Sequence, residues 1–250
     1  MSKVTFRRLF FDIETSPNIG FFWKSGYKLN VGPENIIQER SVICVCWKWE
    51  GEKTVHSLEW NKGNDKKLIQ EFIKVMNEAD ECIGHNSDNF DTKWLRTRCL
   101  YHRIPAFPFY QSVDTLKIAR EQFNFNSNKL NYISQFLGIG KKKETGYDLW
   151  KNIVLNNDIK AMKTMVDYCK QDVKLLEEVF NLMKTYALPK VHRGILEGGN
   201  KVSCPGCGGT HFKLSKTRVS ARGYVTKQLH CPDCGQYHTV SESIYNKFVK

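Results

Sequence analysis

The 250-residue sequence predicts an α/β domain that is followed by a small cysteine-rich ribbon. Strand-like apolar segments open the chain, and helical segments are interleaved with the later ones, which is the order typical of an α/β domain. A long amphipathic segment closes this part near residue 187, and two Cys-x₂-Cys pairs lie beyond it. We therefore expect a first domain over residues 1–190 and a linker with the ribbon over residues 191–250.

Four segments in the first half of the chain have the apolar character of strands. Residues 5–13 form a buried run that stops before Pro17, and residues 41–49 and 54–58 flank a polar turn. Residues 81–84 are a short fourth candidate. These segments predict the strands of a central sheet.

Five other segments have apolar residues at helical spacing. They cover residues 65–79, 90–102, 113–123, 129–137 and 158–187. The last is the most regular, because its apolar stripe runs from Met162 to Phe180 before Pro189 closes the segment. The sequence therefore predicts a long final helix in the first domain.

The charge balance is basic, with a formal net charge of +12 at pH 7. Residues 190–250 hold 10 basic and 3 acidic side chains, a surplus of 7 in this part of the chain. Such a surplus suits a polyphosphate partner, because Lys and Arg displace the counterions condensed on its backbone. No run of about 18 apolar residues occurs, so we expect no membrane span. The first eight residues lack the apolar stretch of a signal peptide, so a cytoplasmic location is expected.

The segment Phe10-Phe11-Asp12-Ile13-Glu14-Thr15 places two carboxylates among apolar residues. Residues two apart in a strand point to the same face, so Asp12 and Glu14 should lie side by side. Like charges in such a place repel each other and lose hydration unless a cation neutralises them. Oxygen ligands suit Mg²⁺ or Mn²⁺, which makes the pair a candidate metal site. The alternative is a strand end whose acids face water.

Two further segments carry acidic residues. One follows a short strand and opens a helix, and contains Asn86, Phe90 and Asp91; the other places Tyr168 and Asp172 one turn apart on the long helix. Together with the FDIET segment, the N-x-x-x-F-D and Y-x-x-x-D motifs resemble the DEDD superfamily of 3′→5′ exonucleases, which has the ribonuclease H-like fold. The last motif indicates the tyrosine branch, which includes proofreading domains of family B DNA polymerases. The layout with a following ribbon is similar to stand-alone bacteriophage exonucleases.

This resemblance covers residues 4–187 and implies a mixed central sheet and a nuclease that uses two divalent cations, Mg²⁺ or Mn²⁺. Asp12 would bridge the cations, Glu14 and Asp172 would complete the tighter site, and Asp91 would hold the second cation. Tyr168 would orient the attacking water. The product would be a 5′-mononucleotide released from a 3′ end.

The four C-terminal cysteines form a C-x₂-C…C-x₂-C array with 23 residues between the pairs Cys204/Cys207 and Cys231/Cys234. This spacing predicts one closed structural Zn²⁺ site, and a reducing compartment disfavours the alternative of disulfides. The intervening residues 212–218 and 224–230 predict a hairpin. Buried thiols are expected at the remaining five cysteines, which are Cys44, Cys46, Cys82, Cys99 and Cys169.

Aromatic rings interleaved with lysines occur in Phe21-Phe22-Trp23-Lys24-Ser25-Gly26-Tyr27-Lys28, between the first acids and the next strand. Such a segment suits stacking on the bases of a single strand. The alternative places Phe21 and Phe22 in the core and Trp23 at its rim. Contacts with nucleic acid are expected from Thr15, Trp23, Asn86, Phe90, Arg218 and Arg222.

The sequence thus predicts an exonuclease that acts on single-stranded or frayed DNA in replication, repair or recombination. An RNA 3′→5′ exonuclease is the alternative within the same chemistry, because no motif reveals a contact to the 2′-hydroxyl. From another class, the alternative is a non-catalytic zinc-ribbon module that binds nucleic acid or docks on a protein. The ribbon itself is expected to bind DNA, or else to contact a replication or recombination protein.

Overall fold

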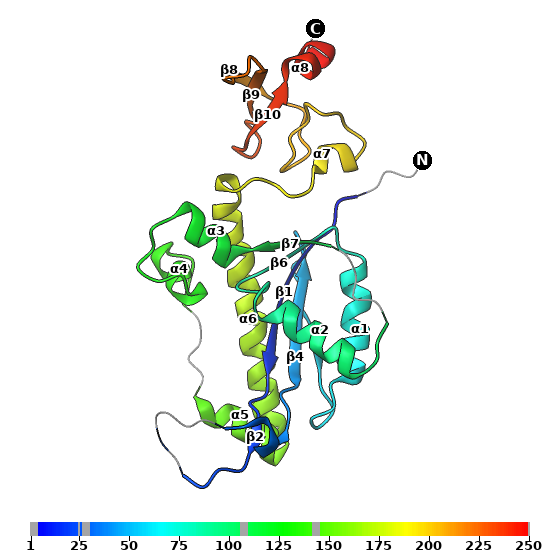
Figure 1. The fold of residues 1–250 in the computed structure, drawn as a ribbon, viewed down its shortest axis with the longest axis vertical. Helices are drawn as coiled ribbons and strands as arrows, with labels where there is room; N and C mark the ends of the chain where they lie inside the picture. Colours follow the sequence, from blue (N-terminus) through cyan, green and yellow to red (C-terminus); the bar gives the residue numbers. More distant parts are fainter. Residues whose placement is uncertain (1–4, 25, 27–30, 106–109, 142–145, 250) are drawn as a thin grey trace.

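The computed structural model describes residues 5–24, 26, 31–105, 110–141 and 146–249 of the chain. A five-stranded mixed sheet with the order β5-β4-β1-β6-β7 forms the centre of the body (Figure 1). Strand β1 is antiparallel to β4 and parallel to β6; β5 is antiparallel to β4, and β7 is parallel to β6. The strands span Arg8–Thr15 (β1), Val42–Trp49 (β4), His56–Glu59 (β5), Glu81–Gly84 (β6) and Gln111–Asp114 (β7). The predicted class, an α/β domain with a mixed central sheet, is confirmed.

Helices cover both faces of this sheet, so a hydrophobic core lies on each side (Figure 1). Helices α1 (Lys66–Asn77) and α2 (Asp91–Tyr101) pack on one face. The other face is covered by α3 (Thr115–Gln122), α4 (Leu130–Phe136), α5 (Tyr147–Asn156) and α6 (Ile159–Met183). A two-stranded sheet of β2 (Ile19–Gly20) and β3 (Ile36–Gln38), with a 3₁₀ turn η1 (Pro33–Asn35), follows β1.

The alternation of side chains along β1 assigns its residues to the two cores. Leu9, Phe11 and Ile13 belong to the core under α1 and α2, whereas Phe10 belongs to the core under α6. Asp12 and Glu14 share the face of Phe10, so they point toward α6.

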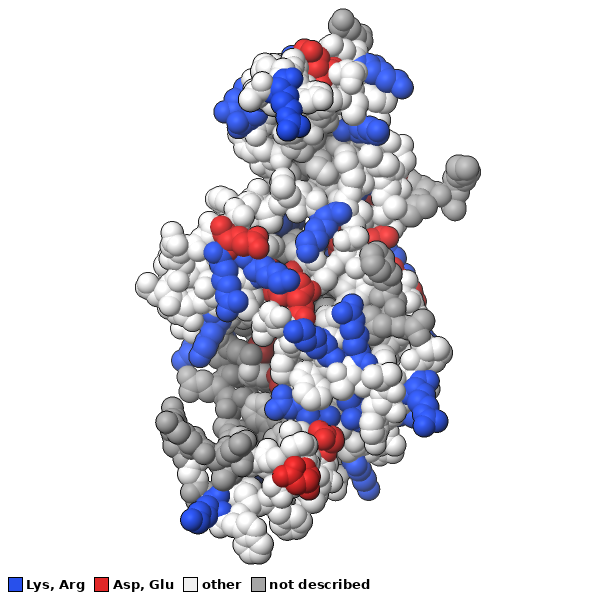
Figure 2. All heavy atoms as spheres, viewed as in Figure 1, with Lys and Arg blue, Asp and Glu red and all other residues white. Residues whose placement is uncertain are grey.

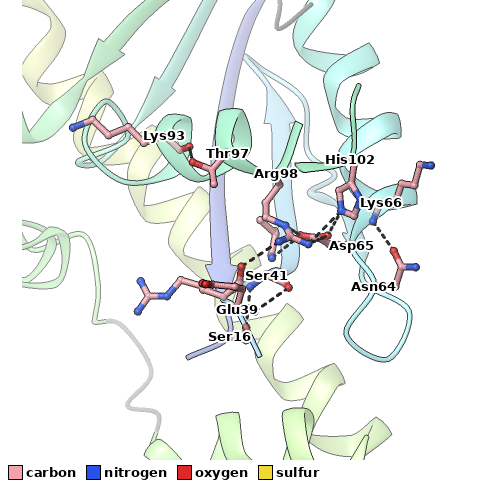
Figure 3. A network of polar contacts seen from close by, with 12 residues as sticks. Ser16, Glu39, Ser41, Asn64, Asp65, Lys66, Lys93, Thr97, Arg98 and His102 are labelled. Carbon is pink, nitrogen blue, oxygen red and sulfur yellow. Dashed lines mark hydrogen bonds and ion pairs between the residues drawn. The ribbon is translucent and has the colours of Figure 1, made fainter. Parts of the chain in front are cut away.

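A buried polar network fixes the start of β4 beside the end of β1 (Figure 3). The fully buried carboxylate of Asp65 accepts two hydrogen bonds of 2.7 Å from Arg98 and one of 2.9 Å from the backbone N–H of Val42. His102 contributes a further contact of 2.6 Å. Burial raises the pKa of Asp65, but the hydrogen bonds from Arg98 and His102 outweigh it and hold the pKa below its ordinary value.

This network reaches the acidic end of β1 through two serines. The backbone N–H of Ser16 donates to the carbonyl oxygen of Ser41 at 2.9 Å, and the N–H of Ser41 donates to the Ser16 hydroxyl at 3.0 Å (Figure 3). Ser41 directly precedes Val42, the residue that Asp65 holds. The end of β1 that carries Glu14 is therefore hydrogen-bonded, through Ser16, to the start of β4.

The C-terminal part contains a second, three-stranded antiparallel sheet with the order β10-β9-β8. Strands β8 (Lys213–Val219) and β9 (Val225–His230) confirm the predicted hairpin, whereas β10 (Tyr237–Ser241) and helix α8 (Glu242–Val249) were not predicted. Val202, Leu229 and Val240 form its small core.

Ion pairs join this C-terminal part to the body. Helix α7 (Arg193–Leu196) lies in the expected linker, and Arg193 pairs with Glu50 at 3.1 Å. Glu50 also pairs with Arg8, which in turn pairs with the buried Glu81 at 2.8 Å. Because these charges are mostly removed from water, the linker is attached at a defined place on the sheet.

Several elements differ from the sequence-based prediction. Strand β1 continues to Thr15 rather than ending at residue 13, so both acids lie inside it. Strand β7 and helix α5 were not predicted: β7 has four residues, and α5 buries only Ile153. The long helix ends at Met183, and a 3₁₀ turn η2 (Lys184–Tyr186) follows. Among the described residues, no helix combines the length and apolar character that a bilayer crossing requires.

Candidate active site

Asp12 and Glu14 of β1 and Asp172 of α6 form a cluster of carboxylates. One carboxylate oxygen from each residue lies within 4.8 Å of the others. Asp172 is buried, and the two strand residues are half-buried. Three negative charges this close repel each other unless a cation neutralises them. A donor set made only of carboxylate oxygens fits a hard divalent cation such as Mg²⁺ or Mn²⁺.

Asp91, at the first position of α2, contacts the backbone of β1 beyond the residues that pair with β6. Strand β6 pairs with β1 only as far as Phe10. Beyond that point the backbone N–H of Ile13 donates to the Asp91 carboxylate at 3.1 Å. Asp91 thus lies at the backbone between Asp12 and Glu14, although it does not belong to the three-carboxylate cluster found among the described residues.

Burial raises the pKa of Asp91 to about 7, and the nearby Asp114 carboxylate adds to this rise. The hydrogen bond from Ile13 acts in the opposite direction but is outweighed. Asp91 is only 3% exposed. A cation beside it would favour its charged form, so its environment suits a role next to a metal site.

Helix α6 places two more groups beside the cluster. Tyr168, with 9% of its surface exposed, lies one turn before Asp172 on the same helix. The thiol of Cys169 contacts the backbone oxygen of Asp12 at 3.4 Å and its carboxylate at 3.6 Å. Cys169 was expected only as a buried thiol; its contact with Asp12 depends on the pairing of α6 with β1, which no local motif reveals.

Asp114, at the end of β7, positions the segment that leads to Asp91. Its carboxylate accepts from the backbone N–H groups of Asn86 at 2.8 Å and Asp88 at 3.2 Å, and caps α3 through Leu116. Asn86 has a φ of 63°, a left-handed conformation that turns the chain after β6. Sequence reasoning missed Asp114, although an aspartate directly before a helical segment is the usual signal of a helix cap.

Asp12 and Asp172 line a cleft of about 550 Å³. Its wall also includes two cations, Arg120 and Lys129, which sequence reasoning did not single out. His85 is held between the Thr115 hydroxyl and the backbone oxygen of Asn128, both at 2.9 Å. The remaining lining residues are Asn86, Leu116, Leu130 and Asn131. A lining that combines carboxylates with cations and amides suits a phosphodiester whose reacting phosphate binds near the acids.

The sequence profile of the RNase H superfamily matches residues 9–184. The chain belongs to the RNase H superfamily. This membership supports a nuclease that acts on nucleic acid, and RNase H-like nucleases use divalent metals. No curated protein matches the sequence.

Among solved structures, this RNase H-like chain is similar to the family B DNA polymerase from the hyperthermophilic archaeon Pyrobaculum calidifontis, with a TM-score of 0.56 and 16% identity. The match covers 88% of the present chain and 31% of the polymerase chain. At this identity the likeness shows a shared fold.

Of the six residues expected to contact nucleic acid, Asn86 alone lies in the described lining of the acid cleft. The backbone oxygen of Thr15 accepts from Trp150 at 3.1 Å, and Phe90 packs against the core under α1 and α2. Trp23 is fully exposed, and Tyr27 and Lys28 of the same segment lie outside the described residues. Arg218 and Arg222 are exposed on the hairpin of the second sheet.

The alternative that Phe21 and Phe22 are core residues is wrong. Their side chains are 72% and 58% exposed, beside the exposed Trp23. Apolar rings in this position leave a surface that a ligand can contact.

The four cysteines of the C-terminal part converge in the way that the spacing predicts. Their sulfur atoms all lie within 4.8 Å of one another, and the pairs Cys204–Cys234 and Cys207–Cys231 are each separated by 3.6 Å. Thiolates at about 2.3 Å from a tetrahedral Zn²⁺ would be about 3.8 Å apart, whereas a disulfide requires about 2 Å. The cluster is therefore compatible with a zinc ribbon. The five other cysteines are buried thiols, as expected.

Proposed function

We propose that this RNase H-like protein is a two-metal-ion 3′→5′ exonuclease that releases 5′-mononucleotides from single-stranded or frayed DNA. The observation that carries the proposal is the convergence of Asp12, Glu14 and Asp172, with Asp91 bound to the intervening backbone. Tyr168 lies one helical turn from this cluster. These five side chains fill the five positions of the tyrosine-branch pattern.

The roles follow from the position of each side chain. Asp12, Glu14 and Asp172 would hold the divalent cations, with Asp91 beside the second one. The cations supply an activated water and neutralise charge on the phosphate. Tyr168 would orient the attacking water through its hydroxyl, while Arg120 and Lys129 on the cleft wall would bind the phosphates of the strand.

DNA is the preferred substrate in this proposal, because one similar solved structure is a DNA polymerase. An RNA exonuclease would use the same acids, so the choice between DNA and RNA must be tested by experiment. End-labelled single-stranded DNA and RNA of the same sequence should be digested with Mg²⁺ or Mn²⁺. We expect mononucleotides to appear from the 3′ end of the DNA.

Two variants separate chemistry from folding in this assay. Asp12→Ala should abolish hydrolysis without loss of the fold, because it removes a half-buried charge from a repelling cluster. Tyr168→Phe should reduce the rate less, because only an orienting hydroxyl is lost. An active Asp12→Ala protein would contradict the assignment, and a Tyr168→Phe rate equal to wild type would remove Tyr168 from the mechanism.

For the C-terminal part we propose a zinc ribbon that docks on the DNA backbone. Figure 2 shows lysine and arginine side chains gathered on this part and across the middle of the body. Strand β8 is exposed along its whole length and carries Lys213, Lys216 and Arg218. Replacing Arg218 and Arg222 together by alanine should lower the slope of log affinity against log salt by about 2. An unchanged slope would favour docking on a protein instead.

A further inference from the structure

Five aromatic side chains form a continuous row on the lobe made by α3 and α4, and we call this set the aromatic row. The ring of Tyr186 meets Phe123 edge-on at 5.0 Å between centroids, and Phe123 meets Phe125 at 5.4 Å. Phe125 contacts Phe136 at 5.4 Å, and Phe136 stacks with Tyr132 at 6.3 Å. The row therefore runs without a break from the turn after α6 to helix α4.

Two rings of the aromatic row are largely open to solvent, its middle is anchored, and Tyr132 at its far end is half-buried. Phe136 is 65% exposed and Tyr186 is 62% exposed. Phe123 and Phe125 are half-buried and pack on the core under α6. Folding does not require Phe136 and Tyr186 to be aromatic, because much of their surface contacts water. A contiguous exposed apolar surface of this kind marks an interaction site.

The aromatic row is continuous with the acid cleft. Lys129, Leu130 and Asn131 line that cleft and directly precede Tyr132 in the chain. The amide of Asn126 donates to the Tyr132 hydroxyl at 3.3 Å, which holds that ring in place. In Figure 1 the lobe lies beside α6, between the chain that leads to the ribbon and helix α5. A strand whose 3′ end occupies the cleft would therefore meet the aromatic row as it leaves.

The residues around the aromatic row carry a positive net charge, which favours a nucleic-acid partner. Residues 120–136 and 184–190 contain four basic side chains and one acidic side chain, a surplus of three. The four basic residues are Arg120, Lys129, Lys184 and Lys190. Rings that accept base faces, combined with cations that follow phosphates, are the features of surfaces that bind single-stranded nucleic acid. A duplex would not fit as well, since its base faces are already stacked.

We propose that the aromatic row is a base-stacking platform that holds the nucleotides on the 5′ side of the residue being removed. This inference rests on the proposed function, because that function places the 3′ end of the strand in the acid cleft. The aromatic row would bind the single strand without sequence preference, since every base has a face to stack.

The test is the affinity of the full-length protein for a fluorescein-labelled dT20, measured by anisotropy without added Mg²⁺ or Mn²⁺. Phe136→Ala and Tyr186→Ala should each raise the Kd about 5-fold, the low end expected for the loss of one stacked base. The double variant should raise it about 25-fold. Tyr101→Ala is the matched control, because this ring is 67% exposed on α2 at the other face of the sheet; its Kd should stay within about twofold of wild type.

A double variant that binds dT20 as tightly as wild type would overturn the platform and indicate another partner, such as a protein. A second measurement uses the wild-type protein, so its result does not depend on whether the variants fold. Photo-cross-linking with 5-iodouracil in the oligonucleotide should label the peptide that contains residues 123–136; labelling confined to other peptides would contradict the inference. If dT20 is bound through the aromatic row but never hydrolysed, the proposed function fails and the platform stands. If the Phe136→Ala and Tyr186→Ala variants hydrolyse DNA and bind dT20 as tightly as wild type, the platform fails and the proposed function stands.

Discussion

Asp91 should lower the stability of the metal-free protein at neutral pH, and Asp91→Asn should remove that cost. Burial raises the pKa of this carboxyl to about 7, whereas an aspartate in an unfolded chain titrates near 3.9. Because the folded pKa lies above the unfolded one, the stability associated with this group is fully present below about pH 4. It is lost as the pH rises through 7.

The size of the effect follows from the same values. Each pKa unit corresponds to about 1.4 kcal/mol, so a rise from about 3.9 to about 7 corresponds to about 4 kcal/mol at pH 8. Asparagine keeps the acceptor for the Ile13 N–H but carries no charge. Asp91→Asn should therefore raise the free energy of unfolding at pH 8 by up to about 4 kcal/mol, or Tm by about 8–16 °C for a chain of this size. It should also reduce hydrolysis sharply.

The assay is thermal unfolding by circular dichroism at pH 4, 6 and 8 without added divalent cations. The gain should be absent at pH 4, and added Mn²⁺ should stabilise wild type more than the variant. Asp88→Asn is the control of opposite sign: burial raises the pKa of Asp88, but hydrogen bonds from Lys117 and Ser112 hold it below its ordinary value. That variant should be less stable at pH 8. An Asp91→Asn protein no more stable than wild type at pH 8 would refute the reasoning.

Three further predictions concern the buried Asp65–Arg98 pair and the zinc ribbon. Arg98→Met should destabilise the protein by about 3–5 kcal/mol in urea unfolding, since it leaves the Asp65 charge buried without its main partner; a loss below about 1 kcal/mol would contradict this. The lowered pKa of Asp65 gives stability that is present above about pH 4 and lost as the pH falls through the folded pKa, so acid unfolding of Arg98→Met should begin at a higher pH than that of wild type. Cys231→Ser should abolish bound zinc and leave the β8–β9 amides unprotected in hydrogen exchange, while the β1 amides stay protected. Protection of both sheets in this variant would show that the ribbon folds without metal.

The position of each acid within β1 and within α6 could be predicted from periodicity, whereas only the family resemblance indicated that these two elements bring their acids together. A spacing of two in a strand puts Asp12 and Glu14 on one face, and the buried stripe of the long helix includes Tyr168 and Asp172. Asp91 is different. Its position depends on where β6 stops and on the left-handed turn at Asn86, which no local pattern revealed. Only the family resemblance linked it to the other acids.

Elements that bury few residues escaped prediction for a related reason. Helix α5 has one buried side chain and β7 has four residues, so neither produces a periodic apolar signal. The aromatic row was missed because its contacts join distant segments. Tyr186 contacts Phe123 from the 3₁₀ turn that follows Met183, whereas the sequence predicted helix through residue 187.

The most direct test of the account is a crystal structure with Mn²⁺, with the ions located by anomalous scattering. We expect two peaks about 3.5–4 Å apart. Both should contact Asp12, one should also contact Glu14 and Asp172, and the other should lie next to Asp91. A single peak away from Asp12, or no peak at the carboxylates at saturating Mn²⁺, would contradict the account.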